Sequence, residues 1–152
     1  MLGVYYRDMT DHILVPFDGS PAARSAARYA CEQFRDASLT LLYVGDPMAD
    51  YSRRRAAPGY TQEDEFKTER QKGEHLLTSI RETLPDDRSI TTDIEGGKPA
   101  KTIIEYADTN DVTQIVIGSH GKQGVARFLL GSVAETVVRR GAVPVTVVRP
   151  DE

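Results

Sequence analysis

The chain alternates short apolar runs with longer segments of helical periodicity, and this alternation constrains its fold more than any other feature. The runs are rich in Val, Ile and Leu, and the segments between them repeat apolar residues every three or four positions. Strands and helices in strict alternation predict a parallel sheet with helices on both faces and right-handed crossovers. The predicted strands are His12–Phe17, Leu39–Val44, Ser89–Glu95, Val112–Ile117 and Val143–Val148.

A helix is predicted between each pair of consecutive strands. In the second of these helices the apolar residues from Phe66 to Leu84 form one stripe, which we expect to pack on the core. The segment Gly45–Tyr60 is predicted to be a long surface loop. Its arginines, Arg53–Arg55, are expected to face solvent, with a contact to a partner or a phosphate as the alternative. The predicted helices are Ala22–Phe34, Gln62–Leu84, Ala100–Asp108 and Ser132–Arg140.

Composition narrows the class of protein. The 152 residues fit one domain, for which we expect an N-terminal extension at 1–10 and a folded unit at 11–150. A net charge of −4 and the absence of Trp argue against a nucleic-acid partner. Cys31 is the single cysteine, so an intrachain disulfide and a Cys-based zinc site are excluded, and we expect a buried, inert thiol.

The sequence also indicates the cellular compartment in which the protein is expected. No apolar run is long enough to cross a membrane, and Met1–Thr10 lacks the features of a secretory signal. We therefore expect a cytoplasmic protein without a membrane partner.

Two loops that follow predicted strands carry the candidate chemistry. In open parallel sheets, ligands bind beyond the carboxyl ends of the strands, at the point where the strand order reverses. The loop after the fourth strand has the spacing G-x2-G-x9-G-S, formed by Gly118, Gly121, Gly131 and Ser132. Glycines let the backbone approach a ligand, and a helix starting at Ser132 would offer free N–H groups to a triphosphate. By spacing alone, an ordinary turn explains this loop equally well, since neither a P-loop nor a GxGxxG pattern is present.

Taken singly, the polar residues of these loops have simpler interpretations. Asp18 alone is a turn residue that bonds its own backbone, and Ser20 is a helix cap. His120 has no partner carboxylate at a fixed spacing, so we expect it to face solvent or a phosphate rather than to act in acid–base catalysis. Because no Ser-His-Asp set, metal triad or carboxylate pair is evident, no catalytic residue is assigned.

Taken together, three motifs resemble the universal stress protein family. They are ILVPFDGS at Ile13–Ser20, GGKPAKTIIEYA at Gly96–Ala107, and GSHGKQGVARFLLGSVAETVVRRGAVPVTVV at Gly118–Val148. The motifs occur in the family's order, and the resemblance covers nearly all of 11–150. It implies a doubly wound, adenine nucleotide alpha-hydrolase-like fold with five strands in the order 3-2-1-4-5, and a homodimer. The intact glycine spacing implies ATP as the ligand, with AMP or another adenine nucleotide as alternatives.

The resemblance also implies positions for the nucleotide. Pro16 and Asp18 would lie at the nucleoside, with Asp18 near the ribose or a metal. Val44 would contact adenine through its backbone, and Ile117 would form a wall of the pocket. The full set of implied nucleotide-binding residues is Pro16, Phe17, Asp18, Val44, Ile117, Gly118, Ser119, Gly121, Lys122, Gly131, Ser132 and Val133.

The glycine loop supplies little positive charge beyond Lys122 and Arg127, so we expect Mg²⁺ to accompany ATP, with no metal ligand assigned.

These observations predict an ATP-binding stress protein that acts as a nucleotide-dependent switch or adapter, with an unidentified protein partner. A slow ATPase or nucleotide hydrolase at the same site is the alternative. A structural adapter whose pocket is empty, or holds AMP or another adenine ligand, is another. Val143–Val148 is apolar and β-branched, so as an edge strand it is expected to pair with its own copy across a two-fold axis.

Overall fold

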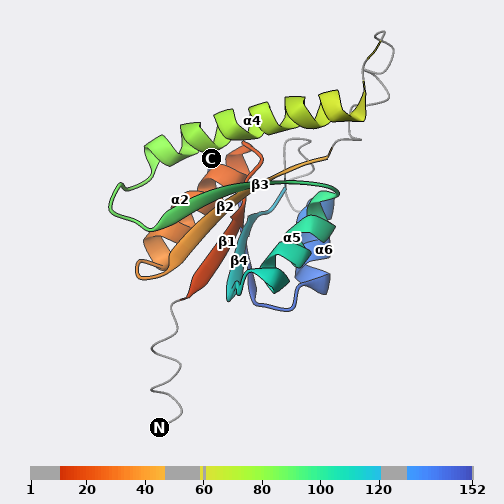
Figure 1. The fold of residues 1–152 in the computed structure, drawn as a ribbon. Coiled ribbons are helices and arrows are strands. Elements are labelled where there is room, and N and C mark those ends of the chain that lie inside the picture. Colours follow the sequence, from red (N-terminus) through yellow and green to blue (C-terminus); the bar gives the residue numbers. More distant parts are fainter. Residues whose placement is uncertain (1–10, 47–58, 60, 121–129, 152) are drawn as a thin grey trace.

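The computed structural model describes residues 11–46, 59, 61–120 and 130–151, which form a five-stranded parallel sheet covered by helices (Figure 1). Every predicted strand and helix is present, with ends that differ by no more than two residues from the prediction. The elements are β1 (His12–Pro16), α2 (Pro21–Gln33), β2 (Ser38–Gly45), α4 (Gln62–Thr83), β3 (Ile90–Gly96), α5 (Pro99–Thr109), β4 (Gln114–Gly118), α6 (Ser132–Arg140) and β5 (Val145–Val148). Most of the predicted loop Gly45–Tyr60 and the extension at 1–10 lie outside the described residues.

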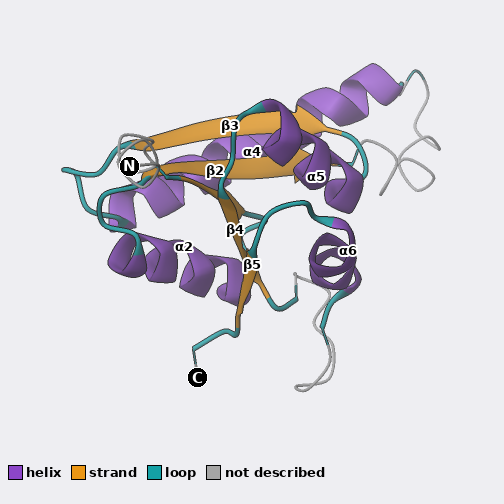
Figure 2. Cartoon of the chain, turned by 90° about the horizontal axis from the view of Figure 1, so that it is seen from below, coloured by secondary structure: helices purple, strands orange, loops and turns teal. Residues whose placement is uncertain are grey.

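The strand order is β3-β2-β1-β4-β5, which confirms the predicted doubly wound topology. Ile13 in β1 pairs with Leu39 of β2 on one side and with Gln114 of β4 on the other. Helices α2 and α4 cover one face of the sheet, and α5 and α6 cover the other (Figures 1 and 2). From β1 the chain moves outward to β2 and β3, then returns to β4 beside β1. The strand order therefore reverses between β1 and β4, and a crevice is expected at their carboxyl ends.

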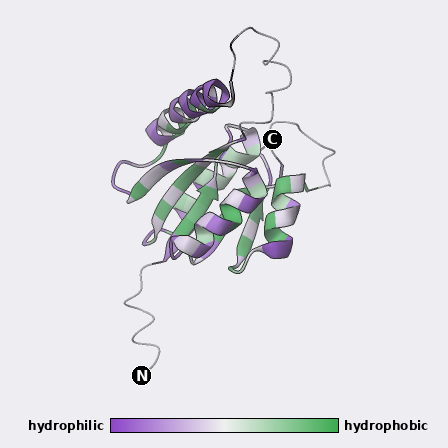
Figure 3. Ribbon diagram, turned by 45° about the vertical axis from the view of Figure 1, so that its right-hand side comes forward, coloured by the Kyte–Doolittle hydropathy of each residue, from purple (hydrophilic) through white to green (hydrophobic). Residues whose placement is uncertain are grey.

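The sheet is buried on both faces, which explains its nearly unbroken apolar strands. Val15 and Leu41 pack under α2 and α4, whereas Leu14 and Ile115 pack under α5 and α6. Figure 3 shows hydrophobic strands at the centre and mostly hydrophilic outer helix surfaces. Helix α2 faces the sheet with small residues, which bring its backbone close to the strands; they include Ala23, Ala26, Ala27 and Ala30.

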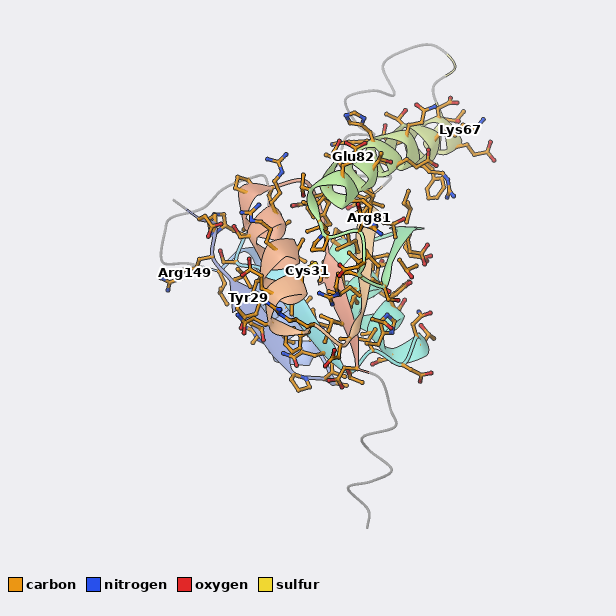
Figure 4. The ribbon with its side chains drawn as sticks, turned by 90° about the vertical axis from the view of Figure 1, so that its left-hand side faces the viewer. Tyr29, Cys31, Lys67, Arg81, Glu82 and Arg149 are labelled. Carbon is orange, nitrogen blue, oxygen red and sulfur yellow. The ribbon has the colours of Figure 1, made fainter. Side chains whose placement is uncertain are left out.

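Both ends of α2 are capped by side chains. The Ser20 hydroxyl accepts the Ala23 N–H at 3.2 Å, which confirms the predicted helix cap. At the other end the helix has no basic residue of its own in its last turn. Arg88, which precedes β3, donates there to the carbonyl oxygens of Cys31 and Phe34 at 2.5 and 2.7 Å. Cys31 lies on α2 (Figure 4). Its thiol is buried, as predicted, and desolvation raises its pKa.

Helix α4 buries hydrocarbon along only part of its length. Leu77 and Ile80 are buried as predicted, but Phe66 is 37% exposed and lies against Gly96 at the end of β3. In the first half of the helix the buried face instead carries Glu65 and Glu69. The buried face of α4 is therefore apolar only in its second half, whereas the predicted apolar stripe began at Phe66.

Charged groups cover the rest of α4. Figure 4 shows Lys67 towards its N-terminal end and Arg81 and Glu82 towards its C-terminal end. Among the described residues, no helix is both long and apolar enough to span a membrane.

Candidate functional site

A cavity of about 340 Å³ lies at the carboxyl ends of β1 and β4, where the strand order reverses. Its walls come from the loops after these two strands, from the end of β2, and from the first turns of α2, α5 and α6. The residues that line it are Pro16, Phe17, Asp18, Ser20, Ala23, Leu42, Val44, Pro99, Ile103, Ile117, Gly118, His120, Gly131, Ser132, Val133 and Ala134.

The turn between β1 and α2 forms one side of the cavity. The Phe17 N–H donates to the Leu42 carbonyl at 2.8 Å, so β1 and β2 remain joined up to the rim. Asp18 then turns the chain: its Oδ1 accepts the Ser20 N–H at 2.9 Å, and Gly19 adopts a φ of +83°. The predicted turn role of Asp18 is therefore present, while the residue also lines the cavity.

The ends of β2 and α5 form an apolar wall. Leu42 and Val44 come from β2, and Pro99 and Ile103 come from the first turns of α5. Ile103 is 2% exposed, so this wall is continuous with the core. A wall of this kind favours a flat, weakly polar group over a charged one.

The start of α6 forms the opposite side. Gly131 is the N-cap residue of α6, and no side chain caps this helix in the part of the chain that is described. The first N–H groups of the helix are therefore available to an external acceptor, and the helix dipole favours an anion there. The Gly131 N–H itself donates to the Ser119 carbonyl at 2.7 Å, which ties the start of α6 to the end of β4.

His120 follows β4 and enters the cavity wall beside Gly131. Its Nδ1 lies 3.0 Å from the Ser119 hydroxyl oxygen, at hydrogen-bonding distance. Ser119 is 5% exposed and is not among the residues that line the cavity.

Nine of the twelve residues that the sequence implied for nucleotide binding line this cavity: Pro16, Phe17, Asp18, Val44, Ile117, Gly118, Gly131, Ser132 and Val133. Ser119 is buried and does not line the cavity. Gly121, Lys122 and Arg127 lie outside the described residues. The cavity is also lined by seven residues that are not among the predicted site residues: Ser20, Ala23, Leu42, Pro99, Ile103, His120 and Ala134. For the α5 residues, the apolar periodicity of this helix together with the predicted topology is the sequence signal that indicates a position near the site.

Within the described residues, no group of three or more His, Cys, Asp or Glu side chains is arranged to hold a metal ion. Asp18 is the one carboxylate that lines the described cavity. The described cavity thus combines an apolar wall, a single carboxylate, and a helix start with unpaired N–H groups.

Comparisons of sequence place the chain among known proteins. It matches the model of the universal stress protein family over residues 9–149. A universal stress protein of Methanocaldococcus jannaschii is 33% identical over 141 residues, covering 90% of this chain and 81% of that protein. A relative from Mycolicibacterium smegmatis is 32% identical over 140 residues and 91% of this chain, but the match spans only 45% of the relative's length.

Solved structures agree in fold. The universal stress protein UspA from Lactobacillus plantarum is 28% identical with a TM-score of 0.73, covering 91% of this chain and 97% of that one. An Arabidopsis thaliana family member with AMP bound is 19% identical with a TM-score of 0.66, covering 93% and 92% of the two chains. A universal stress protein in complex with cAMP is 22% identical with a TM-score of 0.59, covering 93% and 98%. The chain belongs to the universal stress protein family.

Proposed function

We propose that this chain binds an adenine nucleotide, ATP in particular, in the cavity between β1 and β4, and that it acts as a nucleotide-dependent switch or adapter in a stress response. The observation that carries the proposal is that one cavity joins an apolar wall to an uncapped helix start. These are the two environments that a nucleotide needs, one for its base and one for its phosphates.

Each part of the ligand has a matching surface. The base would lie against the wall formed by Leu42, Val44 and Ile103. The ribose hydroxyls would meet Asp18, and the phosphates would approach the N–H groups at the start of α6 together with the Ser132 hydroxyl. The family members solved with AMP and cAMP support the choice of an adenine ligand, because the same fold holds one in those proteins.

A magnesium ion would enter this site with the nucleotide. Mg²⁺ commonly uses one or two carboxylates together with phosphate oxygens, and Asp18 lines the same cavity. Bound in this way, the ion would neutralise phosphate charge. Removal of Mg²⁺ with a chelator is expected to weaken binding of ATP more than binding of AMP.

A homodimer through β5 is part of the same proposal. Among the described residues, β5 pairs only with β4, so its outer edge is open. Its valines, which include Val145 and Val147, are half-buried in the monomer and would lose further exposed surface against a second copy.

The test is calorimetric titration with ATP, AMP and cAMP, together with mass spectrometry of ligand released by heat from freshly purified protein. Val133→Trp places a large ring in the cavity, whereas Val138→Trp adds the same ring at a 47% exposed position of the same helix. Binding should be lost in the first variant and kept in the second. Wild-type protein that neither releases nor binds an adenine nucleotide would overturn the proposal. Steady release of ADP in the same titrations would identify the alternative, a slow hydrolase.

A further inference from the structure

The cavity contains very little positive charge among its described residues. Two of its lining side chains can carry a charge, namely Asp18 in the turn after β1 and His120 after β4. The lining residues from β2, α5 and α6 are apolar or hydroxyl-bearing, and the nearby Glu135 on α6 is exposed and paired with Arg139. His120 is therefore the described lining residue that can become a cation.

The structure holds this histidine in place from two sides. Its Nδ1 is within 3.0 Å of the buried Ser119 hydroxyl. Its backbone lies against the start of α6, since a Cβ atom added at Gly131 would be 3.0 Å from the His120 Cα. No described residue hydrogen-bonds the other ring nitrogen, Nε2, which is thus available to a ligand.

The Ser119 hydroxyl suits both charge states of the ring. When the ring is neutral, the hydroxyl donates to Nδ1, and the ring proton resides on Nε2. When the ring is protonated, Nδ1 donates to the hydroxyl oxygen, and Nε2 keeps its proton. Nε2 is therefore a hydrogen-bond donor in both states, and protonation adds a positive charge without any change of partner.

We propose that His120, positioned by Ser119, is the residue that selects phosphorylated ligands in this cavity and makes their binding stronger as the pH falls. The inference rests on the proposed nucleotide site. A phosphate near the ring favours its charged form, so binding takes up a proton, and affinity increases through the range in which histidines titrate, about pH 6–7. Lys122 and Arg127 belong to residue types that keep their charge in this range, so they cannot produce the effect.

The experiment compares wild type with His120→Gln by calorimetric titration with AMP and with adenosine, at about pH 8 and about pH 6. Glutamine retains an N–H donor but cannot become charged. The titration of the phosphate itself is common to both proteins, as are any effects of His12 and His75, and these cancel in the comparison. We expect wild type to gain about threefold to tenfold more affinity for AMP on acidification than the variant, and adenosine to show no such difference.

Two further measurements separate the possible outcomes. Ser119→Ala should weaken binding of AMP while leaving binding of adenosine unchanged, because it releases the ring without touching the apolar wall. Proton uptake by wild type, measured from binding heats in buffers of different ionisation enthalpy, should accompany AMP and be absent with adenosine. Equal pH dependence in wild type and His120→Gln would overturn this inference while leaving the nucleotide site intact. If wild type binds no adenine ligand at either pH, the proposed function fails, and this inference fails with it.

Discussion

Gly118, the last residue of β4, lies directly against Ala22 in the first turn of α2. A Cβ atom added at Gly118 would be 2.8 Å from the carbonyl carbon of Ala22 and 2.9 Å from its Cβ. Both contacts are shorter than Cβ atoms make in folded proteins, so the helix would have to move away from the sheet. The contact between sheet and helix thus requires a glycine at this position before any ligand is considered.

Gly118→Ala is therefore expected to destabilise the protein even without a ligand. Adding one carbon atom to a closely packed contact costs about 1–3 kcal/mol of unfolding free energy. Urea denaturation, monitored by circular dichroism, measures the loss of unfolding free energy. Ala142→Ser, which also adds one heavy atom but at an exposed position, should change stability by no more than about 0.5 kcal/mol. Equal stabilities of the two variants would contradict the packing explanation.

Arg88 should contribute measurably to stability because it completes the end of α2. Its guanidinium donates to the carbonyls of Cys31 and Phe34 at the end of α2, where the last carbonyls have no partner within the helix. It also donates to the carbonyl of Ala37, which precedes β2. Arg88→Met keeps most of the hydrocarbon and should lower the unfolding free energy by about 1–3 kcal/mol. In Arg28→Met, the matched control, an exposed pair with Asp151 is lost, and a much smaller change is expected. Similar midpoints of urea unfolding for the two variants would count against the capping role.

Two tyrosines, the buried Tyr43 and the half-buried Tyr106, should make the folded protein less stable at alkaline pH. Burial, followed by hydrogen bonds to Glu69 and Asp93, raises the pKa of Tyr43 and of Tyr106 above that of a free phenol. The folded state therefore binds these protons more tightly than the unfolded state does. Their contribution is fully present below the unfolded pKa of about 10, and it is lost as the pH rises above that value.

Urea unfolding at a series of pH values checks this prediction. Between about pH 9 and pH 11 the unfolding free energy of wild type should fall more steeply than that of a Tyr43→Phe, Tyr106→Phe double variant. Absorbance at alkaline pH should show the two phenols ionising only as the chain unfolds. A double variant with the same pH slope as wild type would refute the linkage.

Strand and helix positions could be predicted from the sequence because each element buries apolar residues with its own period. Packing between elements could not be predicted in the same way. The glycine spacing predicts that a ligand approaches Gly118, yet the structure also requires glycine there for contact with α2. Glu65 and Glu69 resemble surface residues in the sequence, but tertiary contacts bury them, and the Tyr43 hydroxyl donates to Glu69 at 2.6 Å. Such pairs join residues distant in the chain, which periodicity does not reveal.

The residues of the candidate site also fall into a group that sequence motifs predict and a group that depends on tertiary packing. Pro16, Asp18 and Ser132 are found because motifs at strand ends carry them and the topology brings those ends together. Pro99 and Ile103 line the cavity from α5. This helix connects β3, at one edge of the sheet, with β4, which lies beside β1. Their place in the cavity depends on how α5 packs on the sheet beside the end of β2, a tertiary arrangement that the sequence does not encode locally.

The two edges of the sheet differ in how open they are. On β3, the Ile94 N–H is taken by the Asp93 Oδ1 at 2.8 Å, and the Asp93 Oδ2 accepts the Tyr106 hydroxyl at 2.8 Å. The hydrogen bonds from Leu39 to Ser89 and from Gly97 to Gly45 show that Ile94 belongs to the outward-facing set of β3 residues. This N–H is thus blocked against pairing with another strand.

None of the residues that the structure describes blocks the edge of β5 in this way. Carbonyls of Pro144 and Val148 face β4, so the backbone groups of Val145 and Val147 face outward. We expect a dimer in sedimentation at micromolar concentration, and we expect Val147→Pro to convert it to a folded monomer, because proline removes an outward N–H and is tolerated on an edge strand. As a control, Asp93→Ala alters the other edge and should leave the β5 dimer intact. A monomeric wild type, or a Val147→Pro variant that is still dimeric, would exclude pairing through β5.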